Sequence, residues 1–255
     1  MGISSGSGSG SFLFDVARGM IKGHRYYTIP GRHEANVETN QLGDLSLVDS
    51  VVVLADPGGI QLEVVSSDAA DTSAGTGART VEVHYLDSSG DEQSETVTMN
   101  GTTAVNTVTT DIDVVQWLHA KTVGSGTVAA GNIDIRTVGG GGTDYCRIGI
   151  GGNQSLSAYY TIPNAHTGYI VGWQGAGLKK RIDFYLRATV ERFDRSITSG
   201  VYLFQDVVSA EATTFAWRPL PFHKVPAGGK VKISVKADAV GGVATGSFDV
   251  LVVAD

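Results

Sequence analysis

Cysteine, positive charge and long apolar runs are all scarce in this chain. The single Cys146 allows neither an intramolecular disulfide nor a multi-cysteine zinc site, which fits a protein made and assembled in a reducing cytoplasm. We expect Cys146 to be a small buried hydrophobic residue. No stretch reaches the run of about 18 apolar residues that a transmembrane helix needs, and residues 2–11 do not resemble a secretion signal. The sequence therefore predicts no membrane partner and no export.

Basic residues are outnumbered by acidic ones. The chain has 19 Lys and Arg against 26 Asp and Glu, with a formal net charge of −7. The basic residues are also scattered along the sequence rather than clustered, so they form no surface that could neutralise phosphates. We therefore expect no nucleic-acid partner.

Motifs that carry catalysis are missing from any usable context. The one match to a nucleophile elbow, residues 2–6, lies in a Gly- and Ser-rich segment with no strand before it and no helix after it. No phosphate-binding loop follows a strand and opens a helix. The chain is therefore predicted to be no enzyme, with no catalytic residue and no cofactor.

Metal-ligand spacings are absent as well. No two of the histidines lie two or four positions apart, the spacings that place ligands on one face of a strand or helix; they are His24, His33, His84, His119, His166 and His223. Asp87, Asp91 and Glu92 form an acidic turn, but the spacing of a calcium loop is missing, so we interpret it as a solvated hairpin tip. The sequence predicts no metal site.

Short β-strands joined by tight turns dominate what is present. Glycine supplies 34 residues, and Val and Thr crowd the segments between turns. Residues 79–86 alternate between apolar and polar side chains, and the turn at residues 87–91 leads into residues 95–99, which predicts a hairpin. Residues 230–236 alternate cleanly, with lysines expected outward and aliphatic residues inward. Trp117 is the expected core anchor of the first module.

Changes in this pattern suggest the domain organisation. Residues 1–50 lack turn-bounded alternation and are predicted to form an extended N-terminal docking arm. Residues 51–138 form a first β-sandwich module, and residues 139–143 contain four consecutive glycines, which we interpret as a linker. Residues 144–255 form a second, jelly-roll-like sandwich. The predicted fold is therefore all-β: two β-sandwich modules preceded by an extended arm.

The arm combines Gly and Ser with apolar anchors. We predict that it docks on a partner and is disordered in the free protein, because ordering an isolated chain costs on the order of 1–2 kcal/mol per residue. The alternative is that Phe12, Leu13 and Phe14 cover the bottom of the first sandwich. The predicted docking residues are Phe12, Leu13, Phe14, Val16, Met20 and Ile21.

Aromatic residues near turns are candidates for a sugar-stacking platform on a β-sandwich, although such residues are more often core. The set comprises Tyr159, Tyr160, Trp173, Tyr185, Phe193, Trp217 and Phe222. Trp173 and Trp217 are the candidate contacts to a host surface glycan.

Several stretches carry a resemblance to a known group. They read DVARGMIKGH (residues 15–24), LEVVSSDAADTSAGTGARTV (62–81), SETVTMNGTTAV (94–105), YTIP (160–163) and SFDVLVV (247–253). Together they resemble β-rich structural proteins of tailed phages, especially marine and cyanophage types, along nearly the whole chain. The resemblance implies a virion component assembled in the host cytoplasm, with an N-terminal arm, a β-rich body and no catalytic residues.

Three functions follow from these observations. The first is a capsid-bound decoration, cement or head-fibre protein, suited to a homotrimer, whose arm binds the major capsid protein. The second is a neck or tail component, such as a fibre adaptor, docking on portal or tail proteins with the symmetry of the tail. The third is a glycan-binding module or hydrolase accessory domain. Copy number in the particle separates the first two, and glycan binding by residues 144–255 would support the third.

Overall fold

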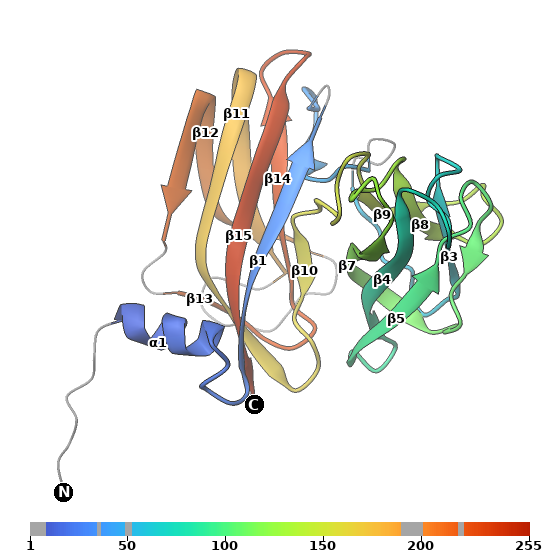
Figure 1. The fold of residues 1–255 in the computed structure, drawn as a ribbon. Helices are drawn as coiled ribbons and strands as arrows, with labels where there is room; N and C mark the ends of the chain where they lie inside the picture. The colour runs from blue at the N-terminus through green and yellow to red at the C-terminus, as the bar shows by residue number, and fades with distance from the viewer. Residues whose placement is uncertain (1–8, 35–36, 49–52, 190–200, 219–221) are drawn as a thin grey trace, which may run out of the picture.

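The computed structural model describes residues 9–34, 37–48, 53–189, 201–218 and 222–255. Within these residues the secondary structure consists of one helix, α1, and the strands β1 to β15, which form a large sandwich and a smaller module beside it (Figure 1). The predicted all-β sandwich fold is confirmed. No helix in the described part of the chain is long and apolar enough to cross a bilayer.

The large sandwich is built from one sheet that folds over itself. Its central path comprises β1 (His24–His33), β15 (Val243–Ala254), β11 (His166–Ala188), β14 (Lys230–Ala237) and β10 (Tyr159–Thr161). Three further strands flank this path: β12 (Leu203–Trp217) and β13 (His223–Val225) pair with β11, and β2 (Gly43–Asp44) pairs with β14.

The long strand β11 belongs to both layers. Its residues 166–178 pair with β15, whereas residues 182–188 pair with β14. Between them the pairing of β11 with β12 shifts register, and Lys179 and Ala212 adopt φ values of 70° and 47° at this corner. Irregularities of this kind bend and twist a strand, so the two layers can face each other.

Apolar side chains at alternate positions of these strands fill the space between the two layers. Phe184 on β11, Ile233 on β14 and Phe248 on β15 are each fully buried and share one apolar core. Residues two apart point to the same side of a strand, so each strand contributes a row of such side chains. The clean alternation of residues 230–236 predicts this inward row for β14.

The smaller module has two sheets and a core of its own. One sheet has the order β6 (Val105–Asn106), β3 (Leu62–Ser66), β8 (Ile133–Thr137) and β9 (Asp144–Ile148), and the other has the order β5 (Glu92–Thr98), β4 (Ala78–Asp87) and β7 (Ile112–Val123). Strands β4 and β5 form the predicted hairpin. Cys146 lies in this core at 1% exposure, as predicted.

A buried aspartate organises the loop that joins β3 to β4. Asp71 is fully buried, and its carboxylate accepts hydrogen bonds from the amides of Ala78 (2.6 Å), Ala130 (2.9 Å) and Gly131 (2.9 Å) and from the Ser66 hydroxyl (2.6 Å). These donors offset the cost of burying a charge. The carboxylate therefore fixes two loops of the module, including most of the stretch at residues 62–81.

Strand pairing moves the expected domain boundaries. Strand β1 pairs with β15 over its whole length, from His24↔Val253 to His33↔Ala244. Residues 24–33 are therefore part of the large sandwich and not of a free arm at residues 1–50. The reason is that their partner strand lies at the other end of the chain, where no local pattern reveals it.

The glycine run is likewise not a linker. Strand β9 pairs with β8, so residues 139–143 turn a hairpin inside the smaller module, and residues 144–148 do not belong to the second sandwich. Gly139 and Gly140 adopt φ values of 99° and 72°, which glycine tolerates in turns. The smaller module is inserted between β2 and β10; we call it the inserted module.

Lys232 on β14 also differs from the expectation. Its side chain points away from the aliphatic core, as the alternation predicts, but it is only 2% exposed. Its Nζ lies 3.0 Å from an Asp44 carboxylate oxygen and 4.1 Å from the centre of the Tyr202 ring. A further layer of chain therefore covers the face that alternation alone assigns to solvent.

Candidate functional site

Helix α1 (Ser9–Ala17) carries four of the six predicted docking residues and lies beside one end of the large sandwich (Figure 1), while Met20 and Ile21 follow it. The prediction of an extended arm is therefore wrong for these residues. The helix ends where Gly19 adopts a φ of 69°, a conformation typical of a helix C-terminus. The chain then enters β1 at His24.

The predicted docking residues divide into two groups. Val16 is 4% exposed and packs with Val171 and Leu251 of the sandwich, and Ile21 lies against the same cluster. Phe14 and Met20, by contrast, are 61% and 67% exposed.

The outward group also includes Phe12, which is 41% exposed and stands edge-on against the His24 ring, while Leu13 is half-buried. The Arg18 guanidinium lies 5.4 Å from the centre of the Phe14 ring. Val16 and Ile21 therefore hold this segment on the sandwich, while Phe12, Phe14 and Met20 are exposed apolar side chains in and just after the helix, and we call these three side chains together the α1 face.

The two candidate glycan contacts have opposite environments. Trp173 is 2% exposed, its ring packs edge-on against Phe215 at 4.7 Å, and its indole N–H donates to Asp206 at 3.1 Å. Trp173 therefore cannot stack on a glycan, and its assignment as a contact is wrong because it lies on the inward row of β11. Trp217 is 55% exposed.

Strand β12 presents further apolar side chains on the large sandwich. Leu203, Phe204 and Val207 are 37%, 53% and 49% exposed, and β12 pairs with β11 alone among the described strands. Its other edge has no strand partner among the described residues, and an edge of this kind invites pairing with another chain.

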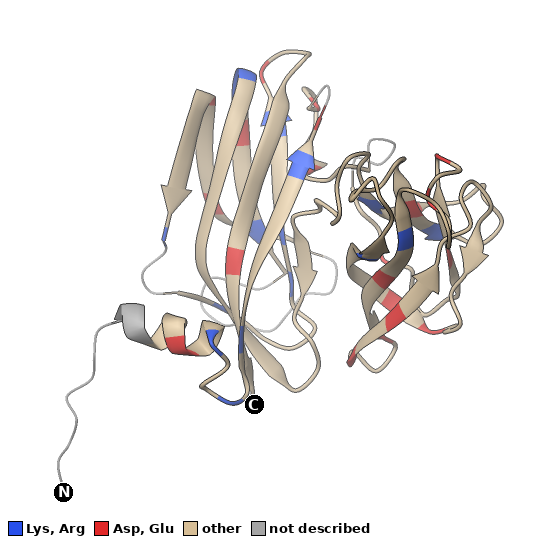
Figure 2. Cartoon of the chain, viewed as in Figure 1, with Lys and Arg blue, Asp and Glu red and all other residues tan. Residues whose placement is uncertain are grey.

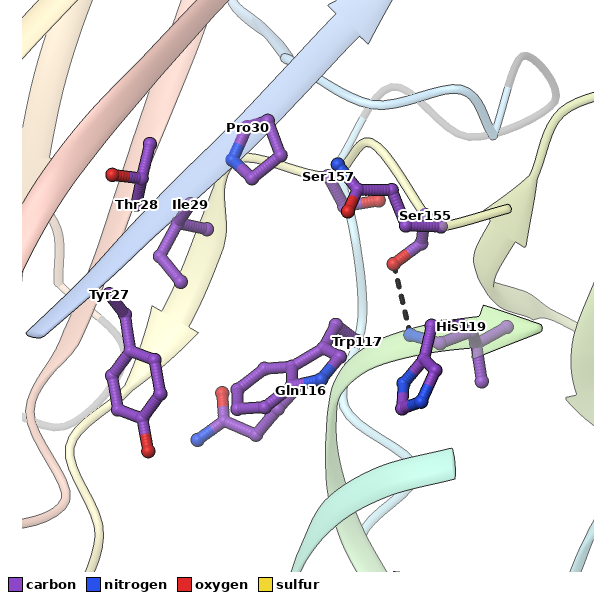
Figure 3. A pocket seen from close by; sticks show the side chains of 11 residues that line it. Tyr27, Thr28, Ile29, Pro30, Gln116, Trp117, His119, Ser155 and Ser157 are labelled. Carbon is purple, nitrogen blue, oxygen red and sulfur yellow. Dashed lines mark hydrogen bonds between the residues drawn. The ribbon is translucent and has the colours of Figure 1, made fainter. Parts of the chain in front are cut away.

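A cleft between the two modules contains aromatic residues from both. Trp117 on β7 faces Tyr27 on β1 at a centroid distance of 5.6 Å and Tyr160 on β10 at 6.2 Å. Figure 3 shows Trp117 and His119 projecting from one strand and Tyr27 from another. Cavities of about 280 Å³ and 560 Å³ adjoin this group. Trp117 is partly buried and packs against the core of the large sandwich. The prediction that it anchors the core of the first module is therefore wrong.

Polar contacts close the same interface. The Gln116 amide donates to the Thr161 carbonyl at 2.6 Å and accepts from the Thr161 N–H at 3.0 Å. Glu92 accepts from Arg25 and from the Tyr160 hydroxyl. Burial, with Glu92 adding to its effect, raises the pKa of Tyr160 well above its usual value, so Tyr160 stays neutral.

The acidic turn is used for structure. One carboxylate oxygen of Asp87 accepts from the amides of Ser89 (2.9 Å) and Asp91 (3.1 Å), while Glu92 pairs with Arg25 of the sandwich. These groups therefore do not converge on a common point.

Lys and Arg lie singly along the strands in the view of Figure 2, consistent with the scattered distribution in the sequence.

Strand pairing brings together three potential ligands that the sequence spacing did not reveal. Glu82 of β4 is paired with His119 of β7, and His84 with Trp117. The Nε2 atoms of His119 and His84 lie 3.3 Å and 3.8 Å from one oxygen of Glu82. The pKa of His84 is lowered, mainly by burial, and hydrogen bonding from Lys121 lowers the pKa of Glu82. In the sequence, the only sign of this cluster is that polar residues lie two apart in two predicted strands: Glu82 and His84 in one, His119 and Lys121 in the other.

Comparisons with known proteins add little to this geometry. No family model matches the chain, and no curated protein matches it. Solved structures with some likeness include the infectious bursal disease virus Gx strain, at 13% identity over 89% of this chain and 72% of that chain with a TM-score of 0.22. The Gt strain matches at 10% identity over 91% and 71%, with a TM-score of 0.18. TM-scores this low do not establish a common fold, so no property of those proteins is transferred to this chain.

Proposed function

We propose that this chain is a non-enzymatic structural component of a tailed-phage virion. In this role it is a capsid-bound decoration, cement or head-fibre protein that docks on the major capsid protein through α1. The observation that carries the proposal is the α1 face: Phe12 and Phe14 on α1 and Met20 just after it are exposed, while Val16 and Ile21 hold this segment on the sandwich. The resemblance of residues 15–24 and 62–81 to tailed-phage structural proteins supports the choice of particle.

The energetics favour a docked helix. Burying a large apolar side chain contributes about 1.5–3 kcal/mol, so three such residues supply a substantial part of the free energy of docking. Because residues 9–17 are already helical and packed through Val16, less conformational entropy is lost on binding than for an extended arm. Docking therefore requires the partner to cover the α1 face only.

Strand β12 supports association with further copies of the chain. A homotrimer in which β12 edges or their apolar side chains meet would cover Leu203, Phe204 and Val207 and leave the α1 face free for the capsid. The alternative position, in the neck or tail, would use the same helix on portal or tail proteins. The ratio of this chain to the major capsid protein in purified particles separates the two, because a decoration protein approaches the abundance of the capsid protein.

The docking role is tested by the triple substitution Phe12→Ser, Phe14→Ser and Met20→Ser. A matched control replaces three exposed apolar residues elsewhere: Val53→Ser, Val108→Ser and Ile150→Ser. Particles assembled with each variant in place of the parent chain are purified and their composition is quantified. We expect the α1 variant to be absent from particles and the control to be present at the parental copy number. Normal incorporation of the α1 variant would refute docking through this face.

A further inference from the structure

Two histidines and a glutamate from neighbouring strands share one small volume of the inserted module. Glu82 and His84 lie two residues apart on β4 and so point to the same face of the sheet, and His119 is the direct cross-strand partner of Glu82. One carboxylate oxygen of Glu82 and one ring nitrogen of each histidine lie within 4.8 Å of one another. We propose that Glu82, His84 and His119 bind a divalent transition-metal ion, with Zn²⁺ as the best match.

The separations fit a common ion. Zn²⁺ binds histidine nitrogen and carboxylate oxygen at about 2.0–2.2 Å, which in tetrahedral geometry places two ligand atoms about 3.4 Å apart. The Glu82 oxygen lies 3.3 Å from His119 Nε2 and 3.8 Å from His84 Nε2. The two imidazole rings are inclined by 23° at a centroid distance of 5.2 Å, so one ring must turn about its Cβ–Cγ bond for both nitrogens to face the ion. Side-chain rotation alone is sufficient.

His84 Nε2 also lacks the hydrogen bond that a buried nitrogen requires. This atom is inaccessible to solvent and has no hydrogen-bond partner, and buried polar atoms are rarely left in this condition. The His84 ring is stacked against the Trp117 indole at 4.6 Å, which restricts it to the vicinity of Glu82. Once one ring has turned, a bound cation would satisfy this nitrogen.

The surroundings of Glu82 hold its carboxylate in place. Lys121 Nζ lies 3.1 Å from Oε1 and also donates to the Thr96 hydroxyl at 3.0 Å. The other oxygen, Oε2, is the one that faces both histidines. Lys121 is therefore a positioning residue that orients the carboxylate without occupying the oxygen used for the ion.

The ligand set selects the class of metal. Two imidazole nitrogens and one carboxylate oxygen suit Zn²⁺ and neighbouring transition metals, whereas Ca²⁺ and Mg²⁺ prefer oxygen ligands. Three protein ligands leave a fourth position for water, and the His119 side chain is 35% exposed on the side of the cleft. An ion here would cross-link β4 to β7 directly beside the contact that Trp117 makes with the sandwich.

The test uses the full chain, stripped with a chelator, and isothermal titration with Zn²⁺. We expect one ion per chain and a rise in the melting temperature. Loss of an outer-shell partner typically weakens metal binding 10–100-fold, so we expect His119→Asn and Glu82→Gln each to weaken binding by at least about tenfold. His119→Asn is the primary variant because its side chain is partly exposed and its loss leaves the core intact.

Two controls make the result decisive. His24→Asn removes a histidine of β1 that does not belong to the cluster of Glu82, His84 and His119, and this variant should bind Zn²⁺ as the parent does. Titration with Mg²⁺ should show no binding. Equal affinity of the parent and His119→Asn, or the absence of a one-to-one complex in the parent, would overturn the proposed site.

Discussion

The large sandwich and the inserted module place their apolar and polar side chains differently. The sandwich buries Trp173, Phe184 and Phe248 in one apolar core, and every exposed aromatic residue in the described part of the chain lies on its segments, as with Phe14 and Trp217. The exposed large apolar residues among residues 53–155 are aliphatic: Val53, Val108, Val138 and Ile150. The aromatic residues of the inserted module are buried in its own core, as with Tyr85 and Tyr145, or partly buried in the cleft, where Trp117 packs against the sandwich.

Buried polar groups also have different roles in the two regions. In the inserted module the Asp71 carboxylate holds backbone amides of two loops, whereas in the sandwich the buried pair of Asp44 and Lys232 joins β2 to β14. The comparison teaches that the inserted module depends on polar groups for the shape of its loops, and the sandwich on apolar packing. It also places the surfaces that we propose for docking and self-association on the sandwich.

The largest expected effect tests the apolar core of the sandwich. Trp173→Ala removes a side chain that is 2% exposed, and such a truncation should lower the free energy of unfolding by about 3–5 kcal/mol. Chemical denaturation measures it. Trp217→Ala is the matched control: Trp217 is 55% exposed, so its cost should stay below about 1 kcal/mol. Equal costs for the two would contradict the assignment of Trp173 to the core.

The next effect tests the polar organisation of the inserted module. Asp71→Ala leaves three backbone amides and the Ser66 hydroxyl without their acceptor. Since a buried donor left without an acceptor costs about 1–3 kcal/mol, a loss of at least about 3 kcal/mol is expected for the four donors together. Hydrogen exchange should accelerate most at Ala78, Ala130 and Gly131. Asp68→Ala, which removes one exposed bond to Ala70, serves as the control, and unchanged protection in Asp71→Ala would refute the role.

Alkaline pH should sharpen the comparison further, because the sandwich holds tyrosines with raised pKa values. Burial, followed by the charge of Asp249, raises the pKa of Tyr26 to about 12, and burial raises that of Tyr160 further. Above about pH 10 these phenols ionise in the unfolded chain but stay neutral in the fold. The free energy of unfolding should therefore fall as pH rises from about 10 to 12.

This alkaline decline is measured by denaturation at a series of pH values, with tyrosinate absorbance as the record of ionisation. Tyr26→Phe keeps the ring and removes the titrating hydroxyl, so its decline with pH should be shallower than that of the parent. An identical slope would exclude Tyr26 from the effect.

The smallest effect on stability is expected at the α1 face. Phe12→Ser, Phe14→Ser and Met20→Ser change exposed side chains, so each substitution should alter the free energy of unfolding by no more than about 0.5 kcal/mol. Val16→Ser, whose parent residue is 4% exposed, should cost more and release the helix from the sandwich. Circular dichroism with thermal denaturation distinguishes the two outcomes. A large cost for the exposed set would mean that these residues support the fold of the free chain.

Local patterns account for much of the fold that could be predicted. The alternation of residues 79–86 and the turn at residues 87–91 specify the β4–β5 hairpin without any distant partner. The apolar character of Cys146 likewise predicts its burial. The same patterns predict apolar anchors near the N-terminus, but they could not divide these into the pair that packs on the sandwich and the three that form the α1 face.

The amino-acid sequence by itself thus determined the all-β class, the β4–β5 hairpin and the inward aliphatic row of β14, because these depend on neighbours within a few residues. Only the tertiary structure decided that β1 pairs with β15, that the glycine run turns a hairpin, that Trp173 is buried and that Lys232 is covered by Asp44 and Tyr202. It also brought His84 and His119 together on β4 and β7. Each of these depends on which distant strands pair, and that choice is set by the summed packing of the whole chain rather than by any local spacing.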